Sequence, residues 1–122
     1  PLYHNLMKHD EYFAQYREYF EKFMKGYFEN GLFSVRLRET AEMIAPYVEK
    51  DPTAFCSYED HRLAVDVLEE VCLLRAESAG GQLRGEIPAT ISTQMEYPEP
   101  RVDASGIDLR DLGDFEDLEK AG

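Results

Sequence analysis

The pattern of apolar and polar positions predicts three amphipathic helices within residues 10–83. The longest runs over 57–83, about seven turns at 3.6 residues per turn. Its apolar residues recur at helical spacing, at Ala64, Val67, Leu68, Val71, Cys72 and Leu74. Its opposite side is polar and carries Arg62, Asp66, Glu69, Glu70 and Glu77. One face of this helix must therefore be covered by other elements.

The ends of the same helix carry recognisable signals. Ser57 is a favourable N-cap residue, and Asp60 three positions later can complete a capping box. We expect Gly80 and Gly81 to loosen the last turns and Gly85 to stop the helix. Arg75 lies near the apolar face, where a half-buried guanidinium needs a carboxylate or carbonyl partner. We therefore predict a structural role for Ser57, Asp60 and Arg75.

The helix expected from Asp10 to Asn30 is rich in aromatic residues. They follow helical spacing at Phe13, Tyr16, Phe20, Phe23 and Tyr27, widened by Tyr12, Tyr19, Met24 and Phe28. Asp10 is predicted to cap its start, and Gly31 suits the left-handed position after its end. A base-stacking surface would need interleaved arginines, so packing and partner contact are the predicted uses. The stripe is wider than one neighbouring helix covers, which indicates a second covering surface.

A third helix is predicted over residues 32–50. It carries a buried stripe at Phe33, Leu37, Ala41, Ile44 and Val48. Pro46 removes a backbone donor and crowds the carbonyl of Glu42, so we expect a kink or break there. Short connectors favour antiparallel neighbours. The predicted fold is all-α: an antiparallel bundle of about three helices in a subdomain of residues 1–83, with an irregular acidic tail.

The tail, residues 84–122, has ten acidic and four basic residues and a linker-like composition with several prolines. Residues 89–97 could add a short extended strand to an available sheet edge. A short helix is predicted within 108–119, and its apolar residues form a candidate interaction face: Leu109, Leu112, Phe115 and Leu118. Two interpretations stay open, a motif that docks in a groove on contact and a disordered acidic tail. In the first, the tail could also mediate a homo-oligomer.

Composition narrows the function further. The chain has 122 residues, with 25 acidic against 13 basic and a net charge of −12. Nucleic acid and anionic membranes are bound through clustered Lys and Arg, so neither is an expected partner. The sequence has no Gly-rich phosphate loop, no Cys-x-x-Cys, no HExxH and no Ser elbow. We therefore assign no catalytic, cofactor-binding or metal-binding residue.

Four segments, in order and closely spaced, resemble one known family. They are IAPYVEKDPTAF (44–55), SYED (57–60), LLRAES (73–78) and GQLRGEIP (81–88). Together they are similar to the C-terminal end of the spore coat protein H (CotH) kinase family, over most of residues 1–90. The resemblance implies an atypical protein-kinase-like fold that uses ATP and a divalent metal to phosphorylate serines of coat proteins. The family's nucleotide- and metal-binding residues lie upstream of the matching segments, so none maps onto this sequence.

The resemblance leads to a specific expectation. The chain would be a fragment, a non-enzymatic helical part of a longer CotH-like protein that supports the catalytic lobe or docks partners. ATP and metal would belong only to that parent. Its partners would be the upstream kinase-like lobe and other coat proteins, and its location the spore coat, or otherwise the cytoplasm or cell surface. The alternative is a free-standing helical protein-interaction module.

Overall fold

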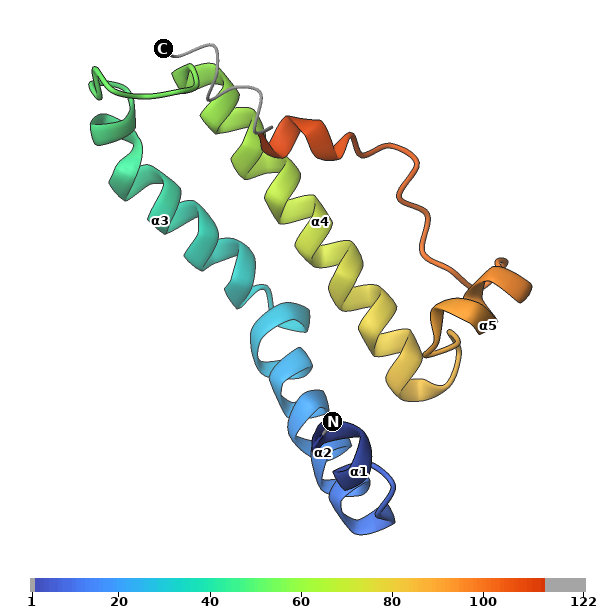
Figure 1. The fold of residues 1–122 in the computed structure, drawn as a ribbon. Coiled ribbons are helices and arrows are strands. Elements are labelled where there is room, and N and C mark those ends of the chain that lie inside the picture. Colours follow the sequence, from blue (N-terminus) through green and yellow to red (C-terminus); the bar gives the residue numbers. More distant parts are fainter. Residues whose placement is uncertain (1, 114–122) are drawn as a thin grey trace. The chain divides into compact units, whose positions relative to one another are not determined.

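The computed structural model describes residues 2–113 (Figure 1). These residues form helices joined by turns and contain no β-strand, which confirms the predicted all-α class. The elements are α1 (Leu2–Leu6), α2 (Asp10–Phe23), the π-helix η1 (Met24–Glu29), α3 (Leu32–Val48), α4 (Tyr58–Arg84), α5 (Ile91–Glu96) and the 3₁₀-helix η2 (Leu109–Leu112). They divide into two units: residues 1–32 with 76–101, and residues 33–75 with the described residues from Val102 onward. Each is described by itself.

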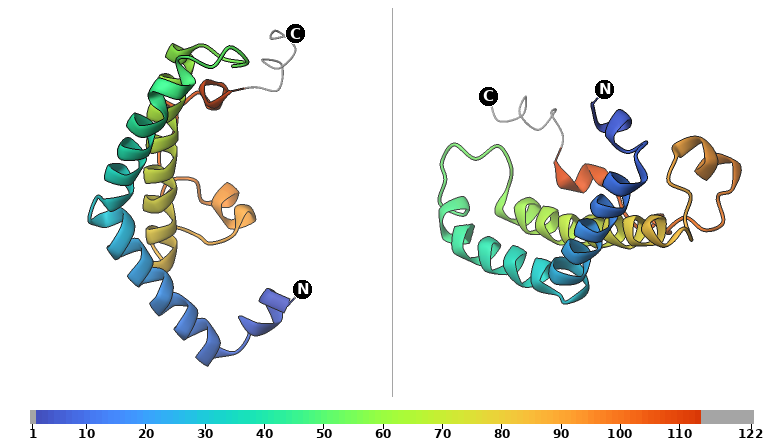
Figure 2. Two further views of the ribbon diagram at one scale, coloured as in Figure 1. Left: turned by 90° about the vertical axis from the view of Figure 1, so that its left-hand side faces the viewer. Right: turned by 90° about the horizontal axis from the view of Figure 1, so that it is seen from below.

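In the second unit, α3 and the first part of α4 lie side by side and antiparallel (Figures 1 and 2). The connector between them is short, as the spacing of the two apolar stripes predicts. Pro46 does not break α3, which continues to Val48. Because Pro46 lies so near the C-terminal end, only one hydrogen bond is lost and little helix remains to be displaced.

Both ends of α4 have defined caps. At its start, the Asp60 N–H donates to Ser57 Oγ at 3.1 Å, and the Ser57 N–H donates to Asp60 Oδ2 at 3.0 Å. At its end, Gly85 has φ +79°, the Gly85 N–H bonds the Gln82 carbonyl at 3.2 Å, and the Glu86 N–H bonds the Gly81 carbonyl at 2.9 Å. These are the two bonds of a Schellman motif.

The two glycines before this cap are part of the packing and do not loosen the helix. Gly80 and Gly81 are both buried within α4. A methyl group at Gly81 would lie 2.6 Å from Ile87 Cδ1, inside contact distance. Among the described residues, Ile87 is buried, as are the apolar side chains of Met24, Val67 and Ala76. Gly81 therefore allows the chain to fold back closely over the last turn of α4.

In the first unit, the start of α2 differs from the prediction. His9 occupies the N-cap and makes no side-chain capping bond, whereas Asp10 is the first helical residue. Asp10 and Glu11 instead place negative charge in the first turn, where it complements the helix dipole.

The end of the aromatic helix also differs, because residues 24–29 form a π-helix. Bonds from i to i+5 bring residues five apart onto one side. Phe28 accordingly meets Phe23 edge to face at 5.6 Å between ring centroids, while Tyr27 stacks on Phe23 at 5.5 Å. Gly31, with φ +78°, ends the segment as predicted.

The predicted strand in residues 89–97 is wrong, because this stretch forms helix α5. Thr90 is its N-cap, and its hydroxyl accepts a bond from the Thr93 N–H at 3.3 Å. The Gln94 side chain donates to the Pro88 carbonyl at 2.6 Å and holds the helix against its own lead-in turn. Local capping thus overrides the linker-like composition.

Candidate functional site

The aromatic residues of α2 form one continuous face, which we call the aromatic face. At 100° per residue they fall within an arc of about 120°. Its members are Tyr12, Phe13, Tyr16, Tyr19, Phe20 and Phe23. Tyr12, Tyr19 and Phe23 keep 48%, 65% and 49% of their surface exposed. Large apolar side chains exposed together at this density are typical of an interaction surface.

One edge of this face forms a wall of a groove, which we call the aromatic groove. It has a volume of about 360 Å³. Phe13, Tyr16 and Phe20 line one side, and Ala79, Leu83 and Ala89 are among the residues opposite. Ala79, Gly85 and Ala89 contribute small residues to this lining, and the Arg17 guanidinium lies over the Phe13 ring at 6.0 Å from its centroid. Such a combination of apolar walls and few polar groups is usual for ligand and peptide pockets.

Two arginines complete the lining of the aromatic groove. Arg17 donates from Nη2 to the Leu83 carbonyl, one of the last acceptors of α4. Arg84 pairs with Glu86, with 2.8 Å between Nη2 and Oε2, and Glu86 raises its pKa through this hydrogen bond. Gln82 is the only other charged or amide-bearing residue in the lining.

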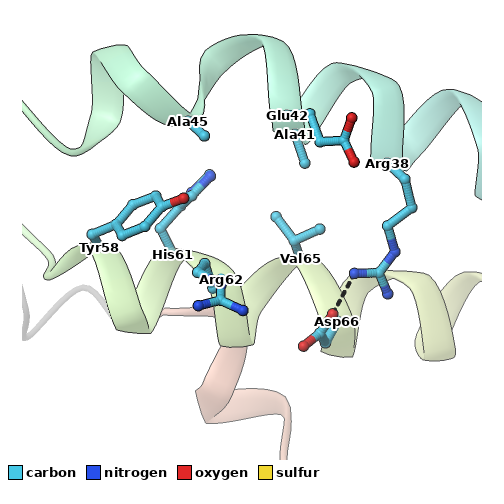
Figure 3. Close-up of a pocket in the computed structure, with 9 residues that line it drawn as sticks. All are labelled: Arg38, Ala41, Glu42, Ala45, Tyr58, His61, Arg62, Val65 and Asp66. Atoms are coloured by element: carbon cyan, nitrogen blue, oxygen red, sulfur yellow. Dashed lines mark hydrogen bonds and ion pairs between the residues drawn. The ribbon is translucent and has the colours of Figure 1, made fainter.

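A second groove lies between α3 and α4 in the other unit (Figure 3). Arg38 reaches from α3 to Asp66 on α4, and its Nε bonds Glu69 Oε2 at 2.8 Å. Hydrogen bonds from Ser34 and then Arg38 lower the pKa of Glu69, whose side chain keeps 16% exposure. Tyr58 and His61 stack at 6.4 Å along the same groove. This groove has a volume of only about 180 Å³. Its polar residues Arg38 and Asp66 form an ion pair that joins the two helices.

The predicted interaction residues of the tail are partly visible. Leu109 and Leu112 lie in η2, and Leu112 lines a cavity with Phe55 in the connector before α4 and with Leu63 in α4. Leu109 is well exposed. Phe115 and Leu118, and the predicted helix beyond residue 113, lie outside the described residues. Only the 3₁₀ turn 109–112 of that helix is therefore observed.

Asp108 fixes the start of η2. Its Oδ1 accepts a bond from the Arg110 N–H at 3.0 Å, and its carboxylate also pairs with the Arg110 guanidinium. These hydrogen bonds lower its pKa to about 2.

Arg75 corrects another expectation. Its side chain is exposed, and no ion pair or hydrogen bond of the described residues involves it. The prediction that Arg75 lies near the apolar face is wrong, because Ala76 is buried whereas Arg75 is exposed to solvent. The sequence also failed to predict the aromatic groove. The aromatic spacing was visible, but only folding brings residues 79–89 opposite it.

Chemistry and membrane topology add two findings. Within residues 2–113, no three His, Cys, Asp or Glu side chains are grouped so that they could hold a metal ion. None of the helices described is both long and apolar enough to cross a bilayer.

Comparison with known proteins gives the class of protein. Residues 1–79, well over half of the chain, match the family described as CotH kinase protein. This all-α chain, with its exposed aromatic face, belongs to the CotH kinase protein family. The match confirms the resemblance expected from IAPYVEKDPTAF and SYED, and it covers the whole of α2, η1 and α3. No curated protein and no solved structure matches the chain.

Proposed function

We infer that this chain is a non-catalytic helical part of a CotH-like kinase or spore coat protein and that it supports the kinase-like lobe. The observation that carries this proposal is the exposed aromatic face of α2, which lies within the matched residues. An apolar strip such as Tyr12, Tyr19 and Phe23 is stabilised when another surface buries it. Family membership supports a kinase-like lobe as that surface and the spore coat as the location.

The polar clusters support the non-catalytic part of the proposal. Arg38 on α3 pairs with both Asp66 and Glu69 on α4, and these ion pairs account for the positions of the two carboxylates. The Asp60 carboxylate accepts a bond from the Ser57 N–H in the capping box of α4, and the Asp108 carboxylate caps η2. Carboxylates engaged in this way are structural, since a catalytic acid or base must be directed at a substrate.

The test has two arms. Mg-ATP should leave the melting temperature of the full chain unchanged, and a rise of several degrees would overturn the non-catalytic assignment. A kinase-like lobe of the family, supplied as a separate polypeptide, should bind the chain. Substituting Tyr19→Ser and Phe23→Ser should weaken that binding, whereas Tyr47→Ser on α3, a residue 76% exposed, should not.

The alternative is a free-standing helical interaction module. It predicts that the chain folds and binds other partners but does not bind the kinase-like lobe. Failure of lobe binding in both the wild-type chain and the Tyr47→Ser control would favour it.

A further inference from the structure

The charge of the aromatic groove differs from that of the rest of the chain. Among its lining residues are Arg17 and Arg84 but no Asp or Glu. Acidic residues outnumber basic ones by 25 to 13 over the sequence. The lining itself is therefore positively charged on an acidic protein, although Glu86 pairs with Arg84 beside it, and Glu29 and Glu77 also act on the Arg84 charge.

Both guanidinium groups have the capacity to bind a ligand. Arg17 donates from Nη2 to the Leu83 carbonyl, and a guanidinium carries five N–H donors in all. That bond also fixes where the side chain lies. Arg84 is shared with Glu86 at 2.8 Å, but its side chain is 55% exposed and can bridge to a second carboxylate. Arginine favours such planar, bidentate contacts with carboxylates.

The walls of the groove define the apolar part of the ligand. Phe13 and Tyr16 present partly exposed rings, and Ala79 and Ala89 opposite leave room beside them. A volume of about 360 Å³ falls at the lower end of the range for small-ligand pockets, enough for one large side chain and its neighbours. Aromatic anchors in pockets of this kind supply most of the binding energy of peptide contacts.

We propose that the aromatic groove binds an acidic segment of another protein, which inserts an aromatic anchor beside Phe13 and Phe20 and places carboxylates on Arg17 and Arg84. The charge complementarity of the lining is the argument for an acidic segment. A second copy of this chain is the alternative occupant, and its association state tests it. This binding goes beyond the proposed support role and does not depend on it.

The experiment uses the full chain and fluorescein-labelled synthetic peptides, with binding followed by fluorescence anisotropy. The acidic probe is Glu-Glu-Phe-Glu-Glu, which does not occur in this chain. Two matched probes replace either the Phe by Gly or the four acids by Lys. The acidic probe should bind, the Gly probe should bind about tenfold more weakly, and the Lys probe should not compete for the groove. The affinity should also fall as salt is raised.

Variants locate the site. Phe13→Ala should weaken the acidic probe about tenfold, and Arg84→Gln about threefold. Two control variants lie in the other unit, Tyr47→Ala on α3 and Arg62→Gln on α4. The first controls for lost aromatic area and the second for lost positive charge. Both should bind the acidic probe as tightly as the unchanged chain does. Far-UV circular dichroism checks that each variant keeps its helix content.

Three results would overturn the proposal. The first is that the Lys probe binds as tightly as the acidic probe or more tightly, and that Phe13→Ala and Arg84→Gln weaken its binding too. The second is acidic-probe binding that Phe13→Ala and Arg84→Gln leave unchanged. The third is sedimentation showing that the groove is closed by a second copy, with dimerisation abolished by Phe13→Ala.

Discussion

Replacing Gly81 by Ala tests how closely Ile87 packs against α4. The new methyl group would lie 2.6 Å from Ile87 Cδ1 and 2.7 Å from Ile87 Cγ1. Ile87 is only 8% exposed, so it cannot move aside without giving up its own burial. Overpacking of this kind costs about 1–3 kcal/mol. Ala also favours a helix over Gly by about 1 kcal/mol. The net expectation is a loss of about 1 kcal/mol, since overpacking outweighs propensity.

Gly80→Ala is the matched control in the same helical turn. Its methyl group would meet only the mobile end of Arg84, with Nη1 at 3.1 Å, and this side chain can give way. The helix propensity gain of up to about 1 kcal/mol should then remain. The assay is urea denaturation followed by circular dichroism, together with a melting temperature that should fall by about 4 °C for Gly81→Ala.

A third variant removes the cause of the clash. In an Ile87→Ala background, Gly81→Ala should recover the propensity gain and become stabilising. If Gly81→Ala stabilises the otherwise unchanged chain as much as Gly80→Ala does, the close approach of Ile87 to α4 is refuted.

The remaining predictions concern caps and charge. Ser57→Ala should lower the free energy of unfolding by about 1 kcal/mol in urea melts, because the first turn of α4 loses its cap, and an unchanged midpoint would contradict that role. The pKa of Glu69 is lowered from 4.5, so its contribution to stability is present above that pH and is lost as the pH falls through the lower folded-state value. Glu69→Gln should therefore flatten the acid side of the stability profile, whereas Glu70→Gln on the same helix should leave its slope intact.

Much of the helical fold could be predicted because its determinants are local. Ser57 with Asp60, and the glycines Gly31 and Gly85, act through their own turns. The apolar spacing of α3 and α4 likewise depends only on helical periodicity. The same is true of family membership, since each matching segment is a short run of sequence and the segments follow one another in order.

What could not be predicted depends on residues that meet only after folding. From the sequence alone Gly81 only weakens the helix, and its packing role becomes visible because Ile87 lies against it in the folded chain. Residues 24–29 have ordinary α-helical spacing, and nothing but Gly26 hints at a wider turn. In residues 89–97 the prediction relied on the linker-like composition and took no account of Thr90, which caps the start of α5. The aromatic groove joins Phe13 to Ala79, which are remote in sequence.

The wider turn of η1 limits how long a straight partner helix can follow the aromatic face. Along α2 the aromatic residues are spaced by four, three and four positions, at Tyr12, Tyr16, Tyr19 and Phe23. This spacing places them in one line along the helix, as in the contact seam of a coiled coil. After Phe23 the wider turn of the π-helix breaks this spacing, so Tyr27 and Phe28 no longer continue the line of the four rings before them. A continuous seam thus spans about 17 Å at 1.5 Å per residue. Deleting one residue within 24–29 would restore the phase and extend it.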